Sequence, residues 1–205
     1  MIVTIDGPAA SGKGTLARRL GEHLKIPHLD TGLLYRSVGE IMLRAGLPLD
    51  DVEAAVRAAG EVNLAGLDRD RLAAAGLGDA ASRVAAMPRV RAALLKLQQD
   101  FARRPGGAVL DGRDTGTVIA PEADVKLFVT ATPEVRAKRR FHELAGRGDA
   151  ATYEQVLADI RRRDARDAER AVAPLKPAPD AALLDTTLLD IEAAFREVLN
   201  IVRRA

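Results

Sequence analysis

Short apolar runs alternate along the chain with longer stretches whose apolar residues recur at helical spacing. Five of these runs have the length of a strand, and they span Met1 to Asp6, Pro27 to Asp30, Gly107 to Gly112, Asp124 to Ala131 and Ala181 to Thr186. Strands that alternate with helices pair in parallel through crossover connections, and helices then cover both faces of the sheet. The pattern predicts an α/β fold built on a five-stranded parallel sheet, with ligand loops at the carboxyl ends of the strands.

Capping patterns predict where two helices begin and periodicity predicts a third. Thr132 to Glu134 combines a hydroxyl cap, a proline at the first helical position and an early acid. Thr152 to Gln155 has the form of a capping box. Apolar residues recur at helical spacing from Asp190 to Arg203, which predicts a closing helix packed on the core.

The middle of the chain, residues 37–105, contains no convincing strand pattern. The segments from Asp51 to Ala59 and from Ala80 to Arg103 are predicted to be helical, and the segment from Gly60 to Gly78 is predicted to be irregular. We therefore expect residues 37–105 to form a compact helical arm attached to the sheet.

The chain of 205 residues is long enough for one full core, so we expect a single domain over residues 1–205. Residues 143–151 contain Gly146-Arg147-Gly148-Asp149 and separate two predicted helices. This short segment is predicted to be either a mobile lid or a simple turn.

Composition removes several classes of function. The 31 basic and 29 acidic residues leave a net charge of +2, without the excess found in proteins that coat nucleic acids. The absence of cysteine excludes thiolate metal sites and disulfides, and the three histidines share no zinc-binding spacing. No signal peptide or apolar run of about 18 residues is present. We expect a cytoplasmic protein with no membrane partner.

The strongest motif follows the first predicted strand and opens a helix. It reads Gly7-Pro8-Ala9-Ala10-Ser11-Gly12-Lys13-Gly14-Thr15. In such a phosphate-binding loop, or P-loop, backbone N–H groups surround phosphate oxygens and the lysine reaches the terminal phosphates. An ordinary glycine turn would not explain a lysine between two glycines. The motif predicts that these residues bind ATP, that Lys13 is catalytic, and that the protein is a small-molecule phosphotransferase of the P-loop NTPase type.

One residue of the motif departs from the general pattern. Gly14 occupies the position that usually carries a hydroxyl, so Thr15 must supply any hydroxyl directed at Mg²⁺. We therefore expect Thr15 to be one of the metal ligands.

A second group of polar residues follows the third predicted strand, where Asp111-Gly112-Arg113-Asp114 ends at the ligand edge of the sheet. An acidic strand end in a P-loop protein commonly holds hydrated Mg²⁺, so Asp111 is predicted to bind the metal through water and to be catalytic. Arg113 suits a phosphate and Asp114 suits a base. A surface ion pair is the alternative for these two residues.

The second predicted strand leads into Asp30-Thr31-Gly32-Leu33-Leu34-Tyr35-Arg36. A tight turn opens a helix there and places Arg36 one turn along, near the carboxyl end of the strand. Arg36 is therefore a candidate to clamp an acceptor phosphate. The alternative is an ordinary exposed helix arginine.

Two arginine-rich stretches flank the predicted lid, from Arg136 to Arg140 and from Arg161 to Arg170. Phosphoryl transfer requires several cations, because negative charge spreads over the oxygens of the transferred group. We therefore expect Arg139 and Arg163 to be catalytic. Helical spacing also places Asp167 and Arg170 on the same face as Arg163.

Two alternatives remain for these charged stretches. Interleaved acids would make the second stretch a solvated helix with surface ion pairs. RNA binding is the weaker alternative, because only Phe141 and Tyr153 supply aromatic rings nearby.

Taken together, these motifs resemble the bacterial cytidylate kinases of the nucleoside monophosphate kinase group, and the resemblance runs nearly end to end. It rests on Thr4 to Thr15, Leu29 to Gly32 with Tyr35 and Arg36, Ala80 to Ser82 with Val84 to Ala86, Pro88 to Arg91, Asp111 to Thr117, Arg163 to Asp167, and Arg170 to Leu175. The resemblance implies in-line phosphorylation of CMP and dCMP by ATP with Mg²⁺ as cofactor. It also implies a monophosphate-binding arm at 37–105 and a lid at 143–151.

The resemblance also implies how the acceptor is held. Thr31 and Tyr35 belong to the matching acceptor motif. The remaining roles are cytosine recognition by Ser82, Arg91 and Asp114, ribose binding by Arg163 and Asp167, and phosphate binding by Arg36, Arg113 and Arg170. The expected partners are ATP and CMP or dCMP, without nucleic acid, and the expected state is a monomer.

One departure weakens the prediction of base selectivity. Many members carry a sheet insertion in the arm and an arginine about nine residues before the serine that matches Ser82, where this chain has Ala73. A kinase for UMP, AMP or another small metabolite is therefore the first alternative. An ATPase stimulated by nucleic acid is the second.

Overall fold

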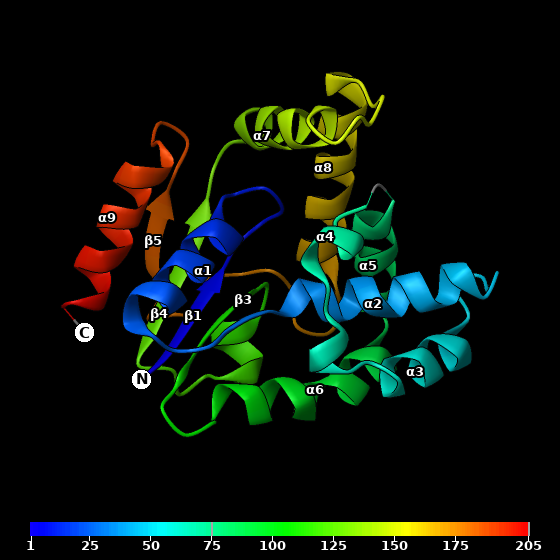
Figure 1. Cartoon of the computed structure of the whole chain (residues 1–205), viewed down its shortest axis with the longest axis horizontal. Helices are drawn as coiled ribbons and strands as arrows, with labels where there is room; N and C mark the ends of the chain where they lie inside the picture. Colours follow the sequence, from blue (N-terminus) through cyan, green and yellow to red (C-terminus); the bar gives the residue numbers. More distant parts are fainter. Residues whose placement is uncertain (75, 205) are drawn as a thin grey trace. The chain divides into compact units, whose positions relative to one another are not determined.

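A computed structural model describes residues 1–74 and 76–204, and all five predicted strands are present (Figure 1). The strands are β1 (Ile2–Asp6), β2 (His28–Asp30), β3 (Ala108–Gly112), β4 (Val125–Thr130) and β5 (Ala182–Asp185). Their order in the sheet is β2-β3-β1-β4-β5. Strand β1 pairs in parallel with β3 and β4, and β4 pairs in parallel with β5. The predicted α/β fold is confirmed.

The register of the sheet brings the carboxyl ends of β1, β3 and β4, where ligand loops were predicted, to the same level. Asp6, the last residue of β1, lies opposite Gly112 on β3 and Phe128 on β4. The loops that follow β1 and β3 therefore leave the sheet at the same level, as expected for parallel strands.

Two helices complete the core around this sheet. They are α1 (Lys13–Leu24) and α9 (Ile191–Val202), and both contribute apolar side chains to a cluster with the central strands. Leu16, Leu20 and Val198 are fully buried there. The predicted closing helix is confirmed, and it begins after Asp190, whose carboxylate accepts a hydrogen bond from the Ala193 N–H at 2.7 Å.

Two further helices, α7 (Pro133–Ala145) and α8 (Tyr153–Glu169), pack against each other (Figure 1). Both begin as predicted. Thr132 caps α7 by accepting a hydrogen bond from Val135 N–H, and Thr152 forms both halves of a capping box with Gln155.

Residues Asp30–Gln98 form a compact unit of their own. It contains α2 (Thr31–Arg44), α3 (Val52–Gly60), η1 (Leu64–Gly66), α4 (Arg69–Leu72), α5 (Leu77–Ala85) and most of α6 (Pro88–Ala102). Helices α2 and α5 approach closely at Gly39, where an added Cβ would lie 2.8 Å from Ala80 Cβ.

Two predictions for this unit need correction. The segment from Ala80 to Arg103 is not one helix but two, because Pro88 begins α6 and a proline disfavours helical backbone in the residue before it. The segment from Gly60 to Gly78 was predicted to be irregular but contains η1 and α4, each of which an Asn or Asp side chain caps.

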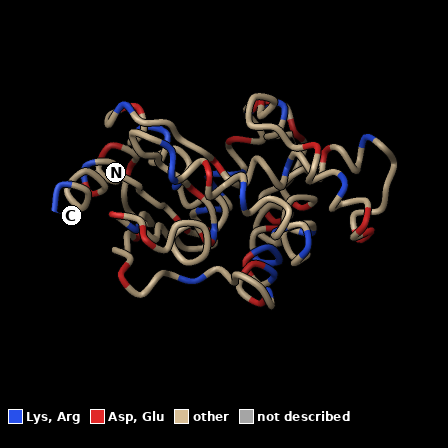
Figure 2. Tube along the Cα trace, turned by 90° about the horizontal axis from the view of Figure 1, so that it is seen from below, with Lys and Arg blue, Asp and Glu red and all other residues tan. Residues whose placement is uncertain are grey.

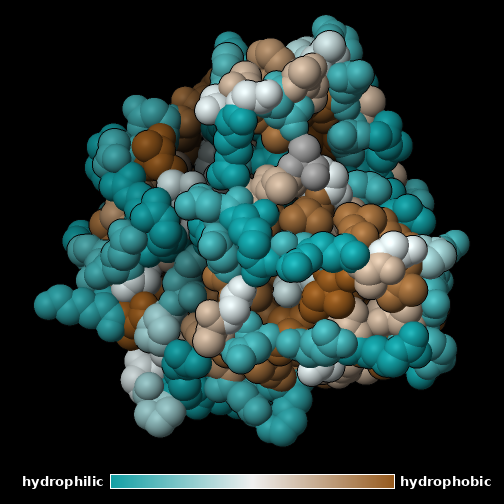
Figure 3. All heavy atoms as spheres, turned by 45° about the vertical axis from the view of Figure 1, so that its right-hand side comes forward, coloured by the Kyte–Doolittle hydropathy of each residue, from teal (hydrophilic) through white to brown (hydrophobic). Residues whose placement is uncertain are grey.

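Charges of both signs are interspersed along the backbone (Figure 2). On the face drawn in Figure 3, apolar side chains emerge in small groups between hydrophilic ones. Within residues 1–74 and 76–204, no helix is both long enough and apolar enough to cross a membrane.

Candidate active site

The P-loop joins β1 to α1 and presents a helix N-terminus. Gly12 has a left-handed backbone (φ +91°) and precedes Lys13, the first residue of α1, and the first turn of the helix contains no acidic side chain. The positive end of the helix dipole is therefore not neutralised locally, which favours an anion at this point. Lys13 is buried, and its ammonium donates a hydrogen bond to the Pro8 carbonyl at 3.2 Å.

Two hydroxyls of the loop differ in their surroundings. Thr15 lies exposed in the first turn of α1. Ser11 is fully buried, and its Oγ has no hydrogen-bond partner in the part of the chain that the structure describes. Since buried hydroxyls are nearly always hydrogen-bonded, the Ser11 hydroxyl points to a group that binds in the loop.

Arg139 of α7 holds the P-loop to the segment that follows β5. Its guanidinium donates to the Thr186 carbonyl at 2.7 Å, to the Thr186 hydroxyl at 3.0 Å and to the Ser11 carbonyl at 3.4 Å. Burial lowers the pKa of Arg139, and Asp185 opposes that change. Its catalytic role stays a prediction, and its visible contacts are with backbone and a threonine.

Arg136, one turn earlier on α7, connects three segments that are distant in the sequence. The guanidinium donates to the Ala131 carbonyl at 2.8 Å, to the Ala9 carbonyl of the P-loop at 3.3 Å, and to both carboxylate oxygens of Asp164 on α8 at 2.6 and 3.0 Å. Only 3% of Arg136 is exposed. Planar, bidentate pairing of this kind fixes orientation as well as distance. Arg136 thus ties α8 to the P-loop.

Asp111, the predicted metal residue, is buried at the end of β3. Its Oδ1 lies 2.7 Å from Nε2 of His28 on β2, a contact in which the imidazole N–H donates to the carboxylate. The sequence had given no chemical role to His28. The structure shows that it orients Asp111.

Asp6 at the end of β1 is a buried carboxylate that sequence reasoning overlooked. It accepts hydrogen bonds from the backbone N–H and hydroxyl of Thr115, both at 2.9 Å, and from the Gly116 N–H at 2.8 Å. Burial raises the pKa of Asp6 to about 6, because those hydrogen bonds offset only part of the cost of removing its charge from water. At neutral pH Asp6 is mostly ionised.

The predicted acceptor residues of α8 lie together with Arg113. The Arg113 Nε donates to Asp167 Oδ2 at 2.8 Å, and both side chains are largely buried, so the pair is not a surface ion pair. Burial alone would raise the pKa of Asp167, but Arg113, Arg170 and Arg163 outweigh it and hold the pKa below its usual value. Arg163 and Asp167 lie one turn apart on α8, whereas Arg170 is the residue after its end, with extended backbone.

Two other arginines of α8 fit the alternative of a solvated helix. Arg161 pairs with Glu134 at 2.9 Å and Arg162 pairs with Asp159, and all four side chains are exposed. Exposed pairs of this kind contribute little stability. The charged stretch therefore divides into an outer, solvated part and an inner part around Asp167.

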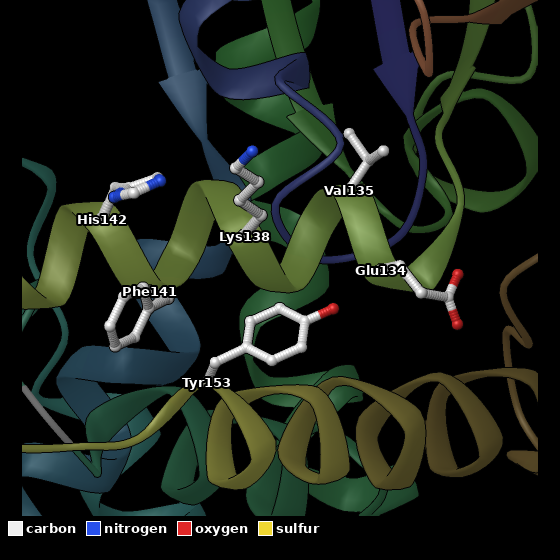
Figure 4. A pocket seen from close by; sticks show the side chains of 6 residues that line it. All are labelled: Glu134, Val135, Lys138, Phe141, His142 and Tyr153. Atoms are coloured by element: carbon white, nitrogen blue, oxygen red, sulfur yellow. The ribbon is translucent and has the colours of Figure 1, made fainter.

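The two aromatic residues near these arginines contact each other. Phe141 and Tyr153 meet edge to face with ring centroids 6.5 Å apart. They line a cavity of about 380 Å³ between α7 and α8 together with Glu134, Val135, Lys138 and His142 (Figure 4). Their mutual packing gives both aromatics a structural role in the α7–α8 contact.

The compact unit Asp30–Gln98 holds all the remaining acceptor candidates except Asp114, which is buried after β3. Asp30 caps α2 by accepting from the Gly32 N–H at 3.0 Å, and Thr31 is buried in the first turn. Tyr35 is buried, and the Arg91 guanidinium lies 5.6 Å from its ring centroid. Ser82 is buried on α5. The structure thus brings Tyr35 and Arg91 together.

The arginines near Ala73 make contacts within the same compact unit. Arg36 donates to the Leu72 carbonyl at 2.8 Å, so it is not simply an exposed helix arginine. Arg71 pairs with Glu40, and Arg69 lies 3.6 Å from Asp30. Both arginines near Ala73 are therefore paired with carboxylates of this unit.

Oxygen donors are available for a divalent cation at the predicted positions. Among the described residues, no group of three or more His, Asp or Glu side chains could hold a metal ion. Mg²⁺ usually keeps several waters and takes one or two protein oxygens together with nucleotide phosphates. The Thr15 hydroxyl and the Asp111 carboxylate are donors of the required chemistry.

Comparison with known proteins agrees with this geometry. The sequence model of the family described as cytidylate kinase matches residues 3–204. The chain belongs to the cytidylate kinase family. Proteins named cytidylate kinase from Xanthobacter autotrophicus and Methylocella silvestris are similar to it, with 63% and 60% identity over all of this chain and 99% and 95% of theirs.

Solved structures show the same fold at low sequence identity. A protein from Eubacterium ventriosum aligns over all of this chain and 99% of its own with a TM-score of 0.59 and 12% identity. A Thermus thermophilus protein aligns over all of this chain and 96% of its own with a TM-score of 0.51 and 23% identity. These likenesses support the fold alone.

In this member of the cytidylate kinase family, three residues outside the predicted set contact predicted site residues or the segment next to them. They are Asp6, His28 and Arg136. Each carried a weak signal in the sequence, since Asp6 and His28 are polar residues within predicted strands and Arg136 belongs to a basic stretch. Their partners lie 109, 83 and 28 residues away, which no local pattern reveals.

Proposed function

We propose that this protein transfers the γ-phosphoryl group of ATP to CMP and dCMP and releases ADP with CDP or dCDP. The match of residues 3–204 to the cytidylate kinase family carries the proposal. In the transfer, an acceptor phosphate oxygen forms a bond to the γ-phosphorus while the bond to the bridging oxygen of ADP breaks. Positioning and charge stabilisation supply the rate, without a covalent enzyme intermediate.

The donor side of the reaction is assigned to the P-loop. Backbone N–H groups at the start of α1 and the Lys13 ammonium would hold the ATP phosphates. Thr15 and, through water, Asp111 would hold Mg²⁺, which when bound neutralises charge on the β- and γ-phosphates. Arg139 and Arg163 are the proposed catalytic arginines, and Arg139 also supports the loop, because its guanidinium contacts the Ser11 carbonyl and Thr186.

The acceptor phosphate is assigned to Arg36, Arg113 and Arg170, and the ribose to Arg163 and Asp167. The ion pair between Arg113 and Asp167 supports this assignment, because phosphate and ribose are neighbouring parts of one nucleotide and the two side chains proposed to bind them are in contact. A depressed pKa keeps Asp167 ionised, so that it can accept hydrogen bonds from hydroxyls.

The base is assigned to Ser82, Arg91 and Asp114, with Thr31 and Tyr35 in the same binding motif. Burial of all five side chains supports the assignment, since hydrogen bonds discriminate between ligands best where water is excluded.

We assign acceptor binding to the arm at residues 37–105, and closure over the reacting groups to the lid at residues 143–151. The assignment of the arm is supported by the compact unit that residues Asp30–Gln98 form. The end of α7 at Ala145 and the start of α8 at Tyr153 support a break at the lid. A cytoplasmic monomer without a nucleic-acid partner stays a prediction.

The function is tested by ADP release from ATP and Mg²⁺ with CMP, dCMP, UMP or AMP offered separately, and with single-stranded RNA as a control. Stimulation by CMP and dCMP alone is the expected result. Comparable stimulation by UMP or AMP would keep the kinase and reassign its base pocket. A response to RNA alone would overturn the enzyme class.

The Asp114→Ala variant tests base recognition. The KM for CMP should rise about tenfold or more, because a buried hydrogen bond to the base is lost, while the KM for ATP stays within about threefold. Steady-state kinetics with each substrate varied in turn gives both values. An equal rise in both KM values would contradict a role in reading the base.

A further inference from the structure

The residue proposed to read the base precedes a short helical turn whose N–H groups need acceptors. This turn, η2 (Thr115–Ile119), follows β3 and has Asp114 at its N-cap position. The first N–H groups of a helix have no acceptor within the helix, and an aspartate at the N-cap usually supplies one. The Asp114 side chain makes no such capping hydrogen bond.

Asp6 supplies the cap from a different strand. Its Oδ1 accepts from the Thr115 N–H and hydroxyl, and its Oδ2 accepts from the Gly116 N–H. Only 4% of Asp6 is exposed, so water does not compete for these donors. An ionised carboxylate has acceptors only, which suits three converging donors.

We propose that Asp6 is a positioning residue that caps η2 from β1 and thereby keeps the Asp114 carboxylate directed at the acceptor base. The inference rests on the proposed function of Asp114. Without Asp6, the Thr115 and Gly116 N–H groups would need another acceptor in a buried place. The aspartate at the N-cap position is the side chain that normally fills that need. If the Asp114 carboxylate turned to accept these N–H groups, it would no longer be directed at the base.

The Asp6→Asn variant tests the proposal with little change in volume. Its amide can accept one N–H but presents its own N–H₂ group to the other donor. The KM for CMP should rise about tenfold, the KM for ATP should stay within about threefold, and the preference for CMP over UMP in kcat/KM should fall. An equal rise in both KM values with unchanged preference would overturn the proposal.

A double-mutant cycle decides whether Asp6 acts through Asp114. In the Asp6→Asn, Asp114→Ala double variant, the preference for CMP over UMP should be no lower than in Asp114→Ala alone. Additive losses would overturn the proposal. The matched control is Asp124→Asn, because Asp124 also accepts a backbone N–H of β1, from Ile2 at 2.6 Å, at the opposite end of the strand. This control should leave both KM values unchanged.

A second variant keeps the test decisive if Asp6→Asn does not fold. Thr115→Val removes only the hydroxyl donor, so the CMP preference should fall by about threefold with an unchanged KM for ATP. Unchanged preference in that variant would overturn the proposal.

Amide hydrogen exchange separates this inference from the proposed function. The Thr115 and Gly116 amides should exchange faster in Asp6→Asn than in wild type, whichever monophosphate stimulates the wild-type enzyme. If CMP does not stimulate wild type, the proposed function fails, and the preference is then measured with the monophosphate that does. Unchanged exchange of both amides would overturn the capping role of Asp6.

Discussion

Lys13→Ala is expected to lower kcat with CMP by about 10³-fold while the protein remains folded. The ammonium is buried beside the Pro8 carbonyl at the N-terminus of α1, where the backbone of the P-loop would place the ATP phosphates. Negative charge develops on these phosphates during transfer, so a fixed cation stabilises the transition state more than the ground state. ADP release with CMP measures the loss.

Thermal unfolding shows whether the Lys13→Ala variant keeps its fold. Its unfolding midpoint should not fall, because a buried ammonium is costly and a small apolar side chain removes that cost. The matched control is Arg18→Ala on the same helix, where the exposed side chain pairs with Glu22 at 2.9 Å. Arg18→Ala should retain normal turnover. Normal turnover and normal Mg²⁺ dependence in Lys13→Ala would contradict the P-loop assignment.

Those parts of the fold that depend on local pattern were predictable. Alternation of apolar residues marks a strand directly, so β4 was predictable. The predicted segment, Asp124 to Ala131, is one residue longer than β4 at each end. The caps at Thr132 and Thr152 were predictable for the same reason, since a cap is decided within four residues. Pro88 was also visible in the sequence, and greater weight on it would have separated α5 from α6.

The sheet order and the polar contacts across it were not predictable from local pattern. Parallel pairing follows from alternating strands and helices, but the position of β1 between β3 and β4 is decided by packing of the whole chain. That order alone places Asp6 opposite Gly112 and beside the loop that contains Asp114. The sequence therefore identified Asp114 as a candidate and could not identify the residue that positions it.

The basic stretches show the same limit within helices. Helical spacing correctly grouped Arg163 with Asp167, because the contacts along one helix face are local. It could not show that Arg136 pairs with Asp164, which lies on another helix. Composition alone could not divide the charges of α8 into solvated pairs and a buried cluster, because burial depends on what packs against each face.

Gly7→Ala is expected to destabilise the protein by about 4 kcal/mol or more, which is a large effect for one methyl group. Gly7 has φ +153°, and an added Cβ would lie 2.0 Å from the Val129 carbonyl oxygen. The positive φ and the contact with the Val129 carbonyl both involve the backbone, so a change of side-chain rotamer cannot relieve either of them. The neighbouring Asp6 is paired with β4, so the strands cannot separate locally without breaking the parallel ladder. For a protein of this size, such a loss lowers the unfolding midpoint by roughly 10 °C.

Gly106→Ala separates steric conflict from backbone strain in this experiment. Gly106 also has a positive φ, of +89°, but no atom lies within 4 Å of its added Cβ. Its replacement should cost about 1–2 kcal/mol, the penalty for an L-residue in left-handed backbone. Urea unfolding of both variants gives the two values. If Gly7→Ala costs no more than Gly106→Ala, close contact with Val129 is not the reason for glycine at the start of the P-loop. If it costs several kcal/mol more, the contact between two parallel strands requires this glycine, independently of any phosphate bound to the loop.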